Sequence, residues 1–244
     1  MFFTCIFAFC LLDSREAQAG TIIKSPAYLG LQRGLVGCWT FDGSYTKAPD
    51  CSGNNNVGTL TGGPTKTAGK IGQALDFDGV DDSVEIPPAS SINNLAALTW
   101  SGWLKIDDLS NSPTFADKGS FGGWTLSFST NLLRFFKSFV GDLDILSVDT
   151  FSTGSWIHIA VTYSGGTSAS SVKMYRDGIQ IATSGSDGSG APGSDTTNSF
   201  ALGCGWNEGC LAGLFFSGLI DDVRLYNRAL SDAEIAAIFK AAER

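Results

Sequence analysis

Acidic and amide side chains gather in one segment of the chain and recur near its end. Residues 42–56 are rich in Asp, Asn and Gly, and a further aspartate precedes the sequence Asp222-Val223-Arg224. Calcium takes several oxygen ligands, and such a segment offers carboxylate, amide and backbone carbonyl oxygens. The pattern predicts a calcium site with these ligands: Asp42, Asp50, Asn54, Asn56 and Asp221. The alternative is that these residues form turns, with Asp221 paired to Arg224 or to a loop amide.

Residues suited to acid–base catalysis are scarce. His158 is the sole histidine, and the glutamates beyond residue 20 are Glu85, Glu208, Glu234 and Glu243. A catalytic triad or a multi-histidine metal site built from this chain alone is therefore nearly excluded. Because His158 lies inside an apolar alternation without a nucleophile motif, we expect a packed or hydrogen-bonded strand histidine.

Four aspartates surround Gly79, namely Asp76, Asp78, Asp81 and Asp82. Two carboxyl groups flanking a glycosidic bond are what a glycosidase requires, so this group is the candidate for hydrolysis. The sequence FDGVDDSV is, however, typical of a strand, a turn and a second strand. We therefore expect a structural role, and the sequence predicts no catalytic residue.

Two tryptophans lie in glycine-rich segments and could contact a sugar. Trp124 follows Phe121-Gly122-Gly123, and Trp206 is followed by Asn207 and Glu208. An indole face stacks on the C–H face of a sugar ring, while amide and carboxylate groups bind its hydroxyls. The pattern predicts a ligand site with Trp206, Asn207, Glu208 and Trp124. The alternative is that both rings belong to the core.

The cysteines and the N-terminus indicate export. Residues 2–12 are almost entirely apolar and are followed by Ala17-Gln18-Ala19, a pattern typical of a cleaved signal peptide over residues 1–19. No Lys or Arg precedes the apolar run, and a buried N-terminal strand is the alternative. Apart from this segment, which is too short to cross a bilayer, the sequence has no candidate membrane span.

Four cysteines follow the predicted signal peptide, which is an even number, as disulfides require. Three pairings are possible, and we favour the short-range one, Cys38–Cys51 with Cys204–Cys210. A four-cysteine zinc site is the rival, but it normally shows closely spaced cysteine pairs, unlike the separations of 13 and 6 residues in this chain. The second disulfide would hold the loop around Trp206 rigid.

The composition is that of one folded β domain. The chain has 244 residues with 43% hydrophobic and 16% charged side chains, which excludes a disordered chain. Its net charge of −8 makes nucleic acid an unfavourable partner. Short β-type runs alternate with turn residues, and period-two alternation is clear in residues 98–106 and 155–164. The thirteen predicted strands are 35–41, 57–60, 73–77, 82–86, 98–106, 123–129, 132–139, 144–148, 155–164, 171–177, 179–183, 199–203 and 215–226.

Turn and helix signals complete this pattern. Asp177-Gly178 between two strands predicts a tight hairpin. Residues 184–198 form a Gly/Ser tract that we interpret as a long surface loop. Ser231-Asp232-Ala233-Glu234 is a capping box, and the apolar residues after it recur at helical spacing. We expect a helix from about Asp232 to Glu243 that packs on the sandwich.

Five segments in order resemble the laminin-G-like jelly-roll domains of the concanavalin A-like lectin/glucanase superfamily. They cover most of residues 34–240 and read GLVGCWTFD from Gly34, DCSGNNNVGTL from Asp50, GKIGQALDFDG from Gly69, WIHIAVTY from Trp156 and GLIDDVRLYNRALS from Gly218. Cys38 and Cys51 stand where the family often has other residues, and this paired replacement suits a disulfide between a strand and a loop. The E-x-D-x-E signature of related laminarinase-like glycosidases is absent from the sequence.

The resemblance implies an all-β fold, an antiparallel two-sheet jelly-roll sandwich with one short C-terminal helix. It implies a domain over residues 34–244, preceded by residues 20–33 as an extension or an extra strand. Relatives often hold a structural calcium between the first strand, an early loop and an aspartate that matches Asp221. They are more often binding or adhesion domains than enzymes.

The predicted function is a secreted or cell-surface, non-enzymatic module that binds carbohydrate or another extracellular ligand. The alternative is a structural subunit of an extracellular filament or surface assembly, with homo-oligomer contacts through residues 20–33, which contain the strand-like Thr21-Ile22-Ile23. A glycosidase of this fold is a minor alternative. The expected partners are a glycan or an extracellular protein, with no nucleic acid and no membrane span after signal removal.

Overall fold

The computed structural model describes residues 31–43, 46–119, 122–205, 210 and 214–242. The predicted signal peptide, residues 1–19, lies outside the described residues. So do residues 20–30 of the predicted extension, including Thr21-Ile22-Ile23. The described part of that extension packs on the domain, since Leu31 is 1% exposed and the backbone oxygen of Arg33 accepts a hydrogen bond from Arg228.

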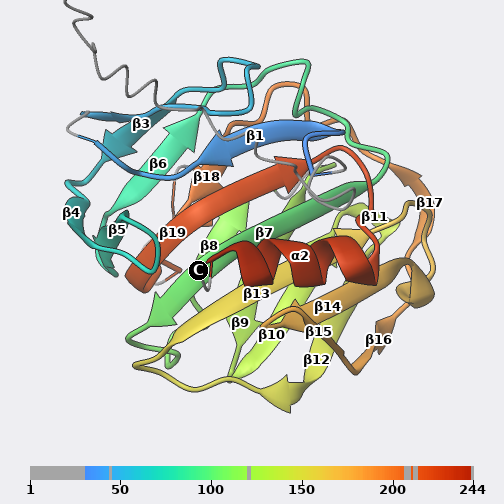
Figure 1. Ribbon diagram of the computed structural model, residues 1–244. Helices are drawn as coiled ribbons and strands as arrows, with labels where there is room; N and C mark the ends of the chain where they lie inside the picture. Colours follow the sequence, from blue (N-terminus) through green and yellow to red (C-terminus); the bar gives the residue numbers. More distant parts are fainter. Residues whose placement is uncertain (1–30, 44–45, 120–121, 206–209, 211–213, 243–244) are drawn as a thin grey trace, which may run out of the picture.

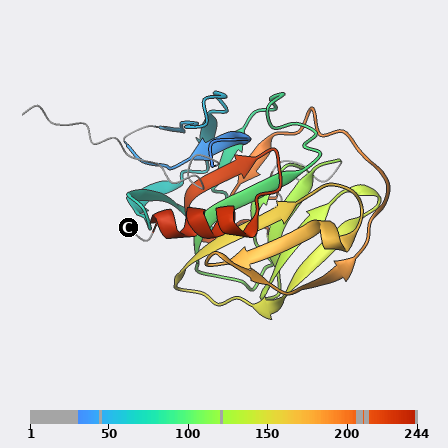
Figure 2. The same ribbon diagram turned by 45° about the vertical axis from the view of Figure 1, so that its right-hand side comes forward.

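Two large antiparallel sheets pack face to face (Figures 1 and 2). The eight-stranded sheet has the order β15 (Ile179–Ile181), β14 (Val172–Arg176), β13 (Trp156–Tyr163), β7 (Leu98–Ile106), β19 (Ser217–Tyr226), β5 (Gln73–Asp78) and β4 (Thr65–Ala68), with β1 (Leu35–Trp39) also paired to β19. The nine-stranded sheet has the order β16 (Thr183–Ser186), β12 (Leu143–Thr150), β10 (Leu132–Lys137), β9 (Trp124–Ser129), β8 (Thr114–Asp117), β18 (Phe200–Leu202), β6 (Ser83–Ile86), β3 (Gly58–Thr61) and β2 (Lys47–Ala48). The predicted two-sheet jelly-roll class is confirmed.

Alternation along the strands separates the core from the outer faces. In β7, Trp100 and Leu104 belong to the core between the sheets, whereas Trp103 points outward against the ring of Phe239. In β13, Ile159 likewise enters the core. Because successive side chains of a strand point to opposite faces, the sequence pattern fixes which residues fill the sandwich.

One helix covers the outer face of the eight-stranded sheet. Helix α2 (Asp232–Ala242) lies across β7 and β13 in Figure 1, and its Ile235 and Ile238 pack with Tyr175 of β14. The predicted capping box is present, because the Glu234 amide donates to Ser231 Oγ and the Ser231 amide donates to Glu234 Oε2. Glu243, the last residue of the predicted helix, lies outside the described residues.

The hairpin between β14 and β15 turns at Asp177 and Gly178, as predicted. Both residues adopt positive φ, 50° and 76°. A two-residue turn of this hand matches the twist of the paired strands, and glycine adopts it without a steric cost. Asp177 Oδ1 also accepts the backbone amide of His158 at 2.9 Å, which ties the turn to β13.

Several short strands were missed by the sequence analysis. They are β2, β4, β8, β16, β17 (Ser189–Pro192) and β11 (Phe139–Gly141), and β17 pairs with β11 in a separate two-stranded sheet. The Gly/Ser tract 184–198 therefore contains strand residues as well as loop, because β16 also pairs along β12. A one-turn helix η1 (Ala169–Ser171) precedes β14. No helix among the described residues is long and apolar enough to cross a membrane.

Both predicted disulfides are formed. Cys38 of β1 joins Cys51 in the following loop, and Cys204 joins Cys210. The favoured pairing is confirmed, and it leaves none of these four thiols for a zinc site.

Replacing both Cys38 and Cys51 with serine should lower the free energy of unfolding by about 3 kcal/mol, because the bond closes a loop of 13 residues. The matched change at Cys204 and Cys210, which close a loop of 6 residues, should cost about 2 kcal/mol. Urea unfolding of the oxidised proteins measures both values. Equal stability of the wild type and the first variant would contradict the expectation.

Candidate functional site

A polar cavity of about 590 Å³ opens on the outer face of the nine-stranded sheet. We call it cavity 1. Alternation in β9 and β10 builds its floor, because Leu126, Phe128, Leu133 and Phe135 enter the core and their neighbours point outward. Its side-chain lining from the strands is Thr114, Asp117, Thr125, Ser127, Ser129, Arg134 and Phe136.

An aromatic ring and a charged pair form one wall of cavity 1. The Arg134 guanidinium lies 5.1 Å from the centre of the Phe136 ring and makes two hydrogen bonds of 2.7 Å to the Asp144 carboxylate. This carboxylate raises the pKa of Arg134, since it favours the charged form. The guanidinium is therefore held in place beside a half-exposed aromatic face.

Hydroxyl groups form the opposite part of the floor. Thr125 Oγ1 donates to Asp117 Oδ1, and Ser127 stands next to Thr114 in the pairing of β9 with β8. Hydroxyls both donate and accept hydrogen bonds, and an aspartate accepts them. Cavity 1 thus combines groups for binding sugar hydroxyls with an aromatic surface.

Two residues near the second disulfide contribute to cavity 1, one inside the loop that it closes and one four residues beyond that loop. Gly205 and Leu214 line the cavity, and the Leu214 carbonyl accepts the Thr114 amide at 2.9 Å. The predicted ligand residues Trp206, Asn207 and Glu208 lie outside the described residues.

Trp124 is not a ligand residue, and its prediction is wrong. Its side chain is 1% exposed, and its ring centre lies 5.4 Å from that of Phe200 inside the sandwich. As the first residue of β9 it shares the inward face with Leu126 and Phe128. The glycine pair before it suggested a surface loop, but strand alternation directs the indole into the core.

Sequence reasoning also missed residues of cavity 1. Arg134 and Phe136 lie two apart in the run from Leu132 to Lys137, and Thr125 and Ser127 lie two apart in the neighbouring strand. The same period-two pattern that identified the strands contained this signal. The pattern does not predict that β9 pairs with β10, and this pairing brings the outward side chains of both strands to one face.

The five predicted calcium ligands do not form one site. Asp50 accepts four hydrogen bonds, from the backbone amides of Cys38, Ser52 and Asn56 and from the Ser52 hydroxyl. These bonds occupy the lone-pair positions of a carboxylate, so Asp50 orders the loop over β1.

The two asparagines of this loop have the same structural role. Asn54 Nδ2 donates to Leu35 O at 3.4 Å, and Asn56 Nδ2 donates to Val36 O at 2.7 Å. Asn56 is 3% exposed, and its backbone carbonyl accepts a hydrogen bond from the Trp39 indole N–H. The hydrogen bonds of Asp50, Asn54 and Asn56 fit the turn-forming alternative, and a calcium role for these three residues stays a prediction.

Asp42 and Asp221 do meet at one loop. Asp42 Oδ1 accepts the Gln73 amide at 2.9 Å, and Asp221 Oδ2 accepts the Ile71 amide at 2.8 Å. Asp221 precedes a β-bulge in β19, where Asp222 has a φ of 45° and pairs with Arg224. Asp221 is fully buried, and its Oδ1 atom has no hydrogen-bond partner among the residues that the structure describes.

Burial, with smaller contributions from the negative charges of Asp222 and Asp42, raises the pKa of Asp221 to about 7 against the opposing effect of the Ile71 amide. A cation at Oδ1 would relieve this repulsion and supply the missing partner. Asp42 and Asp221 therefore fit a calcium ligand pair.

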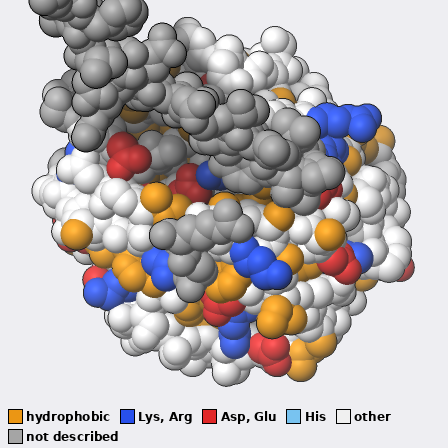
Figure 3. All heavy atoms as spheres, viewed as in Figure 1, with side chains coloured by type: hydrophobic (Ala, Val, Ile, Leu, Met, Phe, Trp, Pro, Cys, Tyr) orange, Lys and Arg blue, Asp and Glu red, His pale blue; other side chains and the backbone are white. Residues whose placement is uncertain are grey.

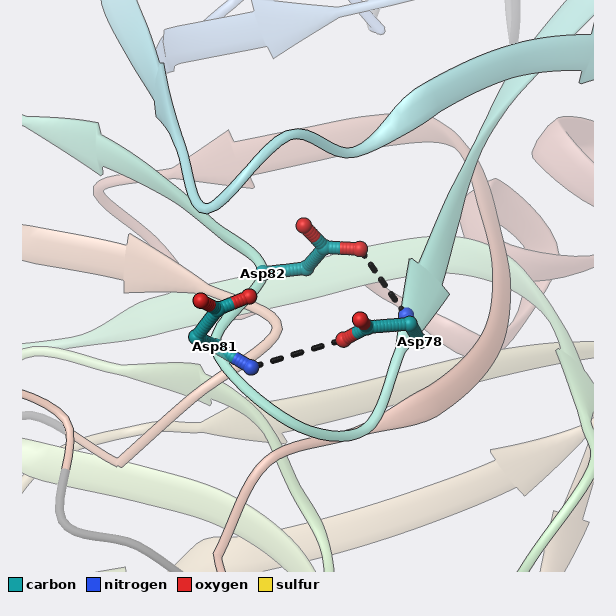
Figure 4. A group of neighbouring side chains, drawn as sticks. All are labelled: Asp78, Asp81 and Asp82. Atoms are coloured by element: carbon teal, nitrogen blue, oxygen red, sulfur yellow. Dashed lines mark hydrogen bonds between the residues drawn. The ribbon is translucent and has the colours of Figure 1, made fainter.

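Three carboxylates gather at the turn between β5 and β6 (Figure 4). Within the part of the chain that the structure describes, Asp78, Asp81 and Asp82 are the one group of three acidic side chains whose oxygens lie within 4.8 Å of each other. Asp82 Oδ2 accepts the Asp78 amide at 2.9 Å, and Asp78 Oδ1 accepts the Val80 amide at 2.8 Å. These bonds agree with the predicted strand–turn–strand role.

His158 is a buried strand histidine, as predicted. It is fully buried, its Nε2 atom lies 3.0 Å from Ser101 Oγ, and the rings of Trp103 and Phe239 flank it. Burial, together with the nearby positive charge of Arg224, lowers its pKa to about 3. The imidazole is neutral at physiological pH, lies under α2 and does not line cavity 1.

The described surface on the α2 side carries charges of both signs in mixed order (Figure 3). The two-sheet sandwich, the polar cavity on one sheet and the helix on the other define a jelly-roll domain of the concanavalin A type. Residues 78–236 match the laminin-G family model described as the Concanavalin A-like lectin/glucanases superfamily. The chain belongs to this family, and the resemblance noted from sequence is confirmed. The search of curated proteins returns no match.

Solved structures share the fold at low identity. Domain 4 of AbnA, a GH43 extracellular arabinanase from Geobacillus stearothermophilus, in complex with arabinotriose, has a TM-score of 0.63 and 24% identity over 84% of this chain and 97% of that chain. The binding domain of botulinum neurotoxin DC in complex with SialylT has a TM-score of 0.67 and 15% identity, over 87% and 52%. Trypanosoma rangeli sialidase has a TM-score of 0.61 and 19% identity, over 86% and 33%.

Proposed function

We propose that the protein is a secreted or cell-surface, non-enzymatic module that binds a glycan in cavity 1. The observation that carries this proposal is the half-exposed Phe136 ring beside a row of outward hydroxyls on β8 and β9. Two disulfides favour an oxidising, extracellular location. The similarity to domains solved with arabinotriose and with SialylT supports a sugar as the ligand.

The two walls of cavity 1 would contact different parts of a bound sugar. A sugar ring would lie against Phe136, while its hydroxyls would bond to Thr125, Ser127 and Asp117. Arg134 would keep Phe136 in position, because its guanidinium is held by Asp144. Shallow sites of this kind bind short glycans with dissociation constants of roughly micromolar to millimolar.

A non-enzymatic role is proposed on two observations. His158 is buried under α2 and uncharged, so it has no access to a ligand in cavity 1. The carboxylates of Asp78 and Asp82 accept turn amides. Release of sugar from arabinan or sialylated glycans by the purified protein would contradict this part of the proposal.

Phe136→Ala should weaken binding of a short glycan at least tenfold, which corresponds to about 1.4 kcal/mol, because it removes the stacking surface. Titration calorimetry with arabinotriose and with a sialylated oligosaccharide identifies the ligand and gives the dissociation constants. Val140→Ala is the matched control, because Val140 is 86% exposed and does not line cavity 1. Equal affinities of Phe136→Ala and the wild type would refute cavity 1 as the site.

Trp206, Asn207 and Glu208 remain predicted ligand residues. Gly205 and Leu214 at the two ends of their segment line cavity 1, which supports the prediction. Trp206→Ala tests it in the same calorimetric experiment: lower affinity with unchanged stability would support a surface platform.

We also propose that Asp42 and Asp221 hold a structural calcium ion. The unpartnered Oδ1 atom of buried Asp221 supports this proposal. A bound ion would neutralise the pair and stabilise the loop around Ile71 and Gln73. The Ile71 amide donates to Asp221, and the Gln73 amide donates to Asp42. Its contribution would be to stability rather than to reaction chemistry.

Calcium at one hundred times its dissociation constant should stabilise the native state by about 2.7 kcal/mol, because it binds only the folded protein. Thermal unfolding with calcium and with excess chelator measures this difference. Asp221→Asn should abolish the response, whereas Asp81→Asn, at the β5–β6 turn, should retain it. A response lost in Asp81→Asn but kept in Asp221→Asn would move the ion to that turn.

A further inference from the structure

A second cavity, of about 560 Å³, lies beside cavity 1 and shares Phe139 with it. We call it cavity 2. It is lined by Lys137 at the end of β10, by Tyr163 at the end of β13, and by residues of the loops around Gly122, Thr167 and Ser194. Its volume lies within the range of roughly 300–1,000 Å³ that is typical of small-molecule sites.

Lys137 brings a buried ammonium group to this cavity. Its side chain is 4% exposed, and its Nζ atom lies 5.8 Å from the centre of the Phe139 ring and 5.7 Å from that of Tyr163. Its hydrogen-bond acceptor among the described residues is the Gly122 carbonyl, at 3.5 Å. An ammonium has three donors, so this one long bond leaves hydrogen-bonding capacity directed at the cavity.

Another buried lysine of the same chain is satisfied very differently. Lys118 Nζ donates to three oxygen atoms, Asn93 Oδ1 at 2.9 Å, the Asp195 carbonyl at 3.2 Å and the Asn198 carbonyl. The fold therefore surrounds one buried lysine with acceptors and leaves Lys137 short of them. Since a buried charge without partners is costly, its retention in a cavity wall points to a ligand that completes it.

The carboxylate that acts on Lys137 is already hydrogen-bonded elsewhere. The Asp195 carboxylate accepts the Asn94 amide at 2.6 Å, and it raises the pKa of Lys137, while burial lowers that pKa by more. No ion pair among the described residues includes Lys137. An anion in cavity 2 would stabilise the charged ammonium, and the two rings would pack against an apolar body.

We infer that cavity 2 binds the carboxylate of an acidic sugar, with Lys137 as the residue that recognises the charge. This inference rests on the proposed glycan-binding function and adds the substrate class. The carboxylate would accept hydrogen bonds from Lys137 Nζ, and the Tyr163 and Phe139 rings would face the sugar ring. The Tyr163 hydroxyl donates to Gly166 O at 2.6 Å, which holds its ring in place.

The test uses D-glucuronate and its uncharged counterpart D-glucose in an NMR titration of the whole chain. Glucuronate should shift the amide signals of Gly122, Gly166 and Gly193, which line cavity 2, and should bind at least tenfold more tightly than glucose. Lys137→Met, which keeps the apolar stem, should abolish this preference, and Lys137→Arg should retain it. Lys47→Met is the control, because Lys47 is exposed on β2, at the far end of the nine-stranded sheet.

Equal affinity of the wild type for glucuronate and glucose, or an unchanged preference in Lys137→Met, would overturn the inference. A titration with arabinotriose distinguishes failure of this inference from failure of the proposed function. Arabinotriose should shift the amide signals of Ser127 and Gly205 in cavity 1, and these shifts should persist in Lys137→Met. If Lys137→Met does not fold, the salt dependence of binding to the wild type provides the test. Half-molar salt should then weaken glucuronate binding several-fold and leave glucose unchanged, whereas equal salt sensitivity would overturn the inference.

Discussion

Trp124→Ala should lower the free energy of unfolding by about 3–5 kcal/mol, because it removes a large ring from the packed centre of the sandwich. The indole is 1% exposed and packs against Phe200, which itself packs against Trp39. The loss of this aromatic chain would leave a cavity between the two sheets. Urea unfolding followed by far-UV circular dichroism measures the change.

The comparison with Phe136→Ala makes this result specific. Phe136 is half-buried on the outer face of the next strand, so its removal should affect stability much less than glycan affinity. Trp124→Ala should do the reverse, leaving glycan affinity unchanged while the protein remains folded. A stable Trp124→Ala protein that no longer binds glycan would show that the ring is a ligand contact after all.

Acid should destabilise the protein strongly through His158. Its pKa is about 3 in the folded protein, against 6.5 for the unperturbed group, so below pH 6.5 the unfolded chain binds a proton that the native state excludes. The stability associated with the neutral ring is complete above about pH 6.5 and is lost as the pH falls towards 3. Each pH unit in this window costs about 1.4 kcal/mol, which sums to about 5 kcal/mol.

The His158→Gln variant isolates this effect. Glutamine can still bond to Ser101 but does not titrate, so the difference in unfolding free energy between the two proteins should shrink as the pH falls from 6.5 to 4. Asp221 works in the opposite direction, because its raised pKa favours the protonated form in the folded state, and it is common to both proteins. A pH-independent difference would mean that His158 has the same pKa in the folded and unfolded protein, and would contradict the expectation.

The sequence patterns predicted the architecture well, because alternation and turn chemistry are local. Strands 98–106 and 155–164 were identified from their period of two, and they became the paired centre of one sheet. Asp177-Gly178 and the capping box at Ser231 each formed the predicted turn and helix start. In each of these segments a few neighbouring residues determine the outcome.

The candidate site was predicted less well, because it depends on distant pairings. The pairing of β9 with β10 gathers Ser127 and Arg134, which are opposite each other in the register. Asp221 and Ile71 are 150 residues apart, yet the Ile71 amide donates a hydrogen bond to the Asp221 carboxylate. Composition could indicate that Asp50 lies in an oxygen-rich loop, but not that three backbone amides would donate to its carboxylate.

The position of α2 has a consequence for how the domain can be held. The helix at the C-terminal side and Leu31 at the start of the described chain pack in one cluster on the outer face of the eight-stranded sheet. Cavity 1 opens on the outer face of the other sheet. A domain anchored to a support through its C-terminal end would therefore present the sheet that carries cavity 1 away from that support, as a sensor chip or a cell wall would require.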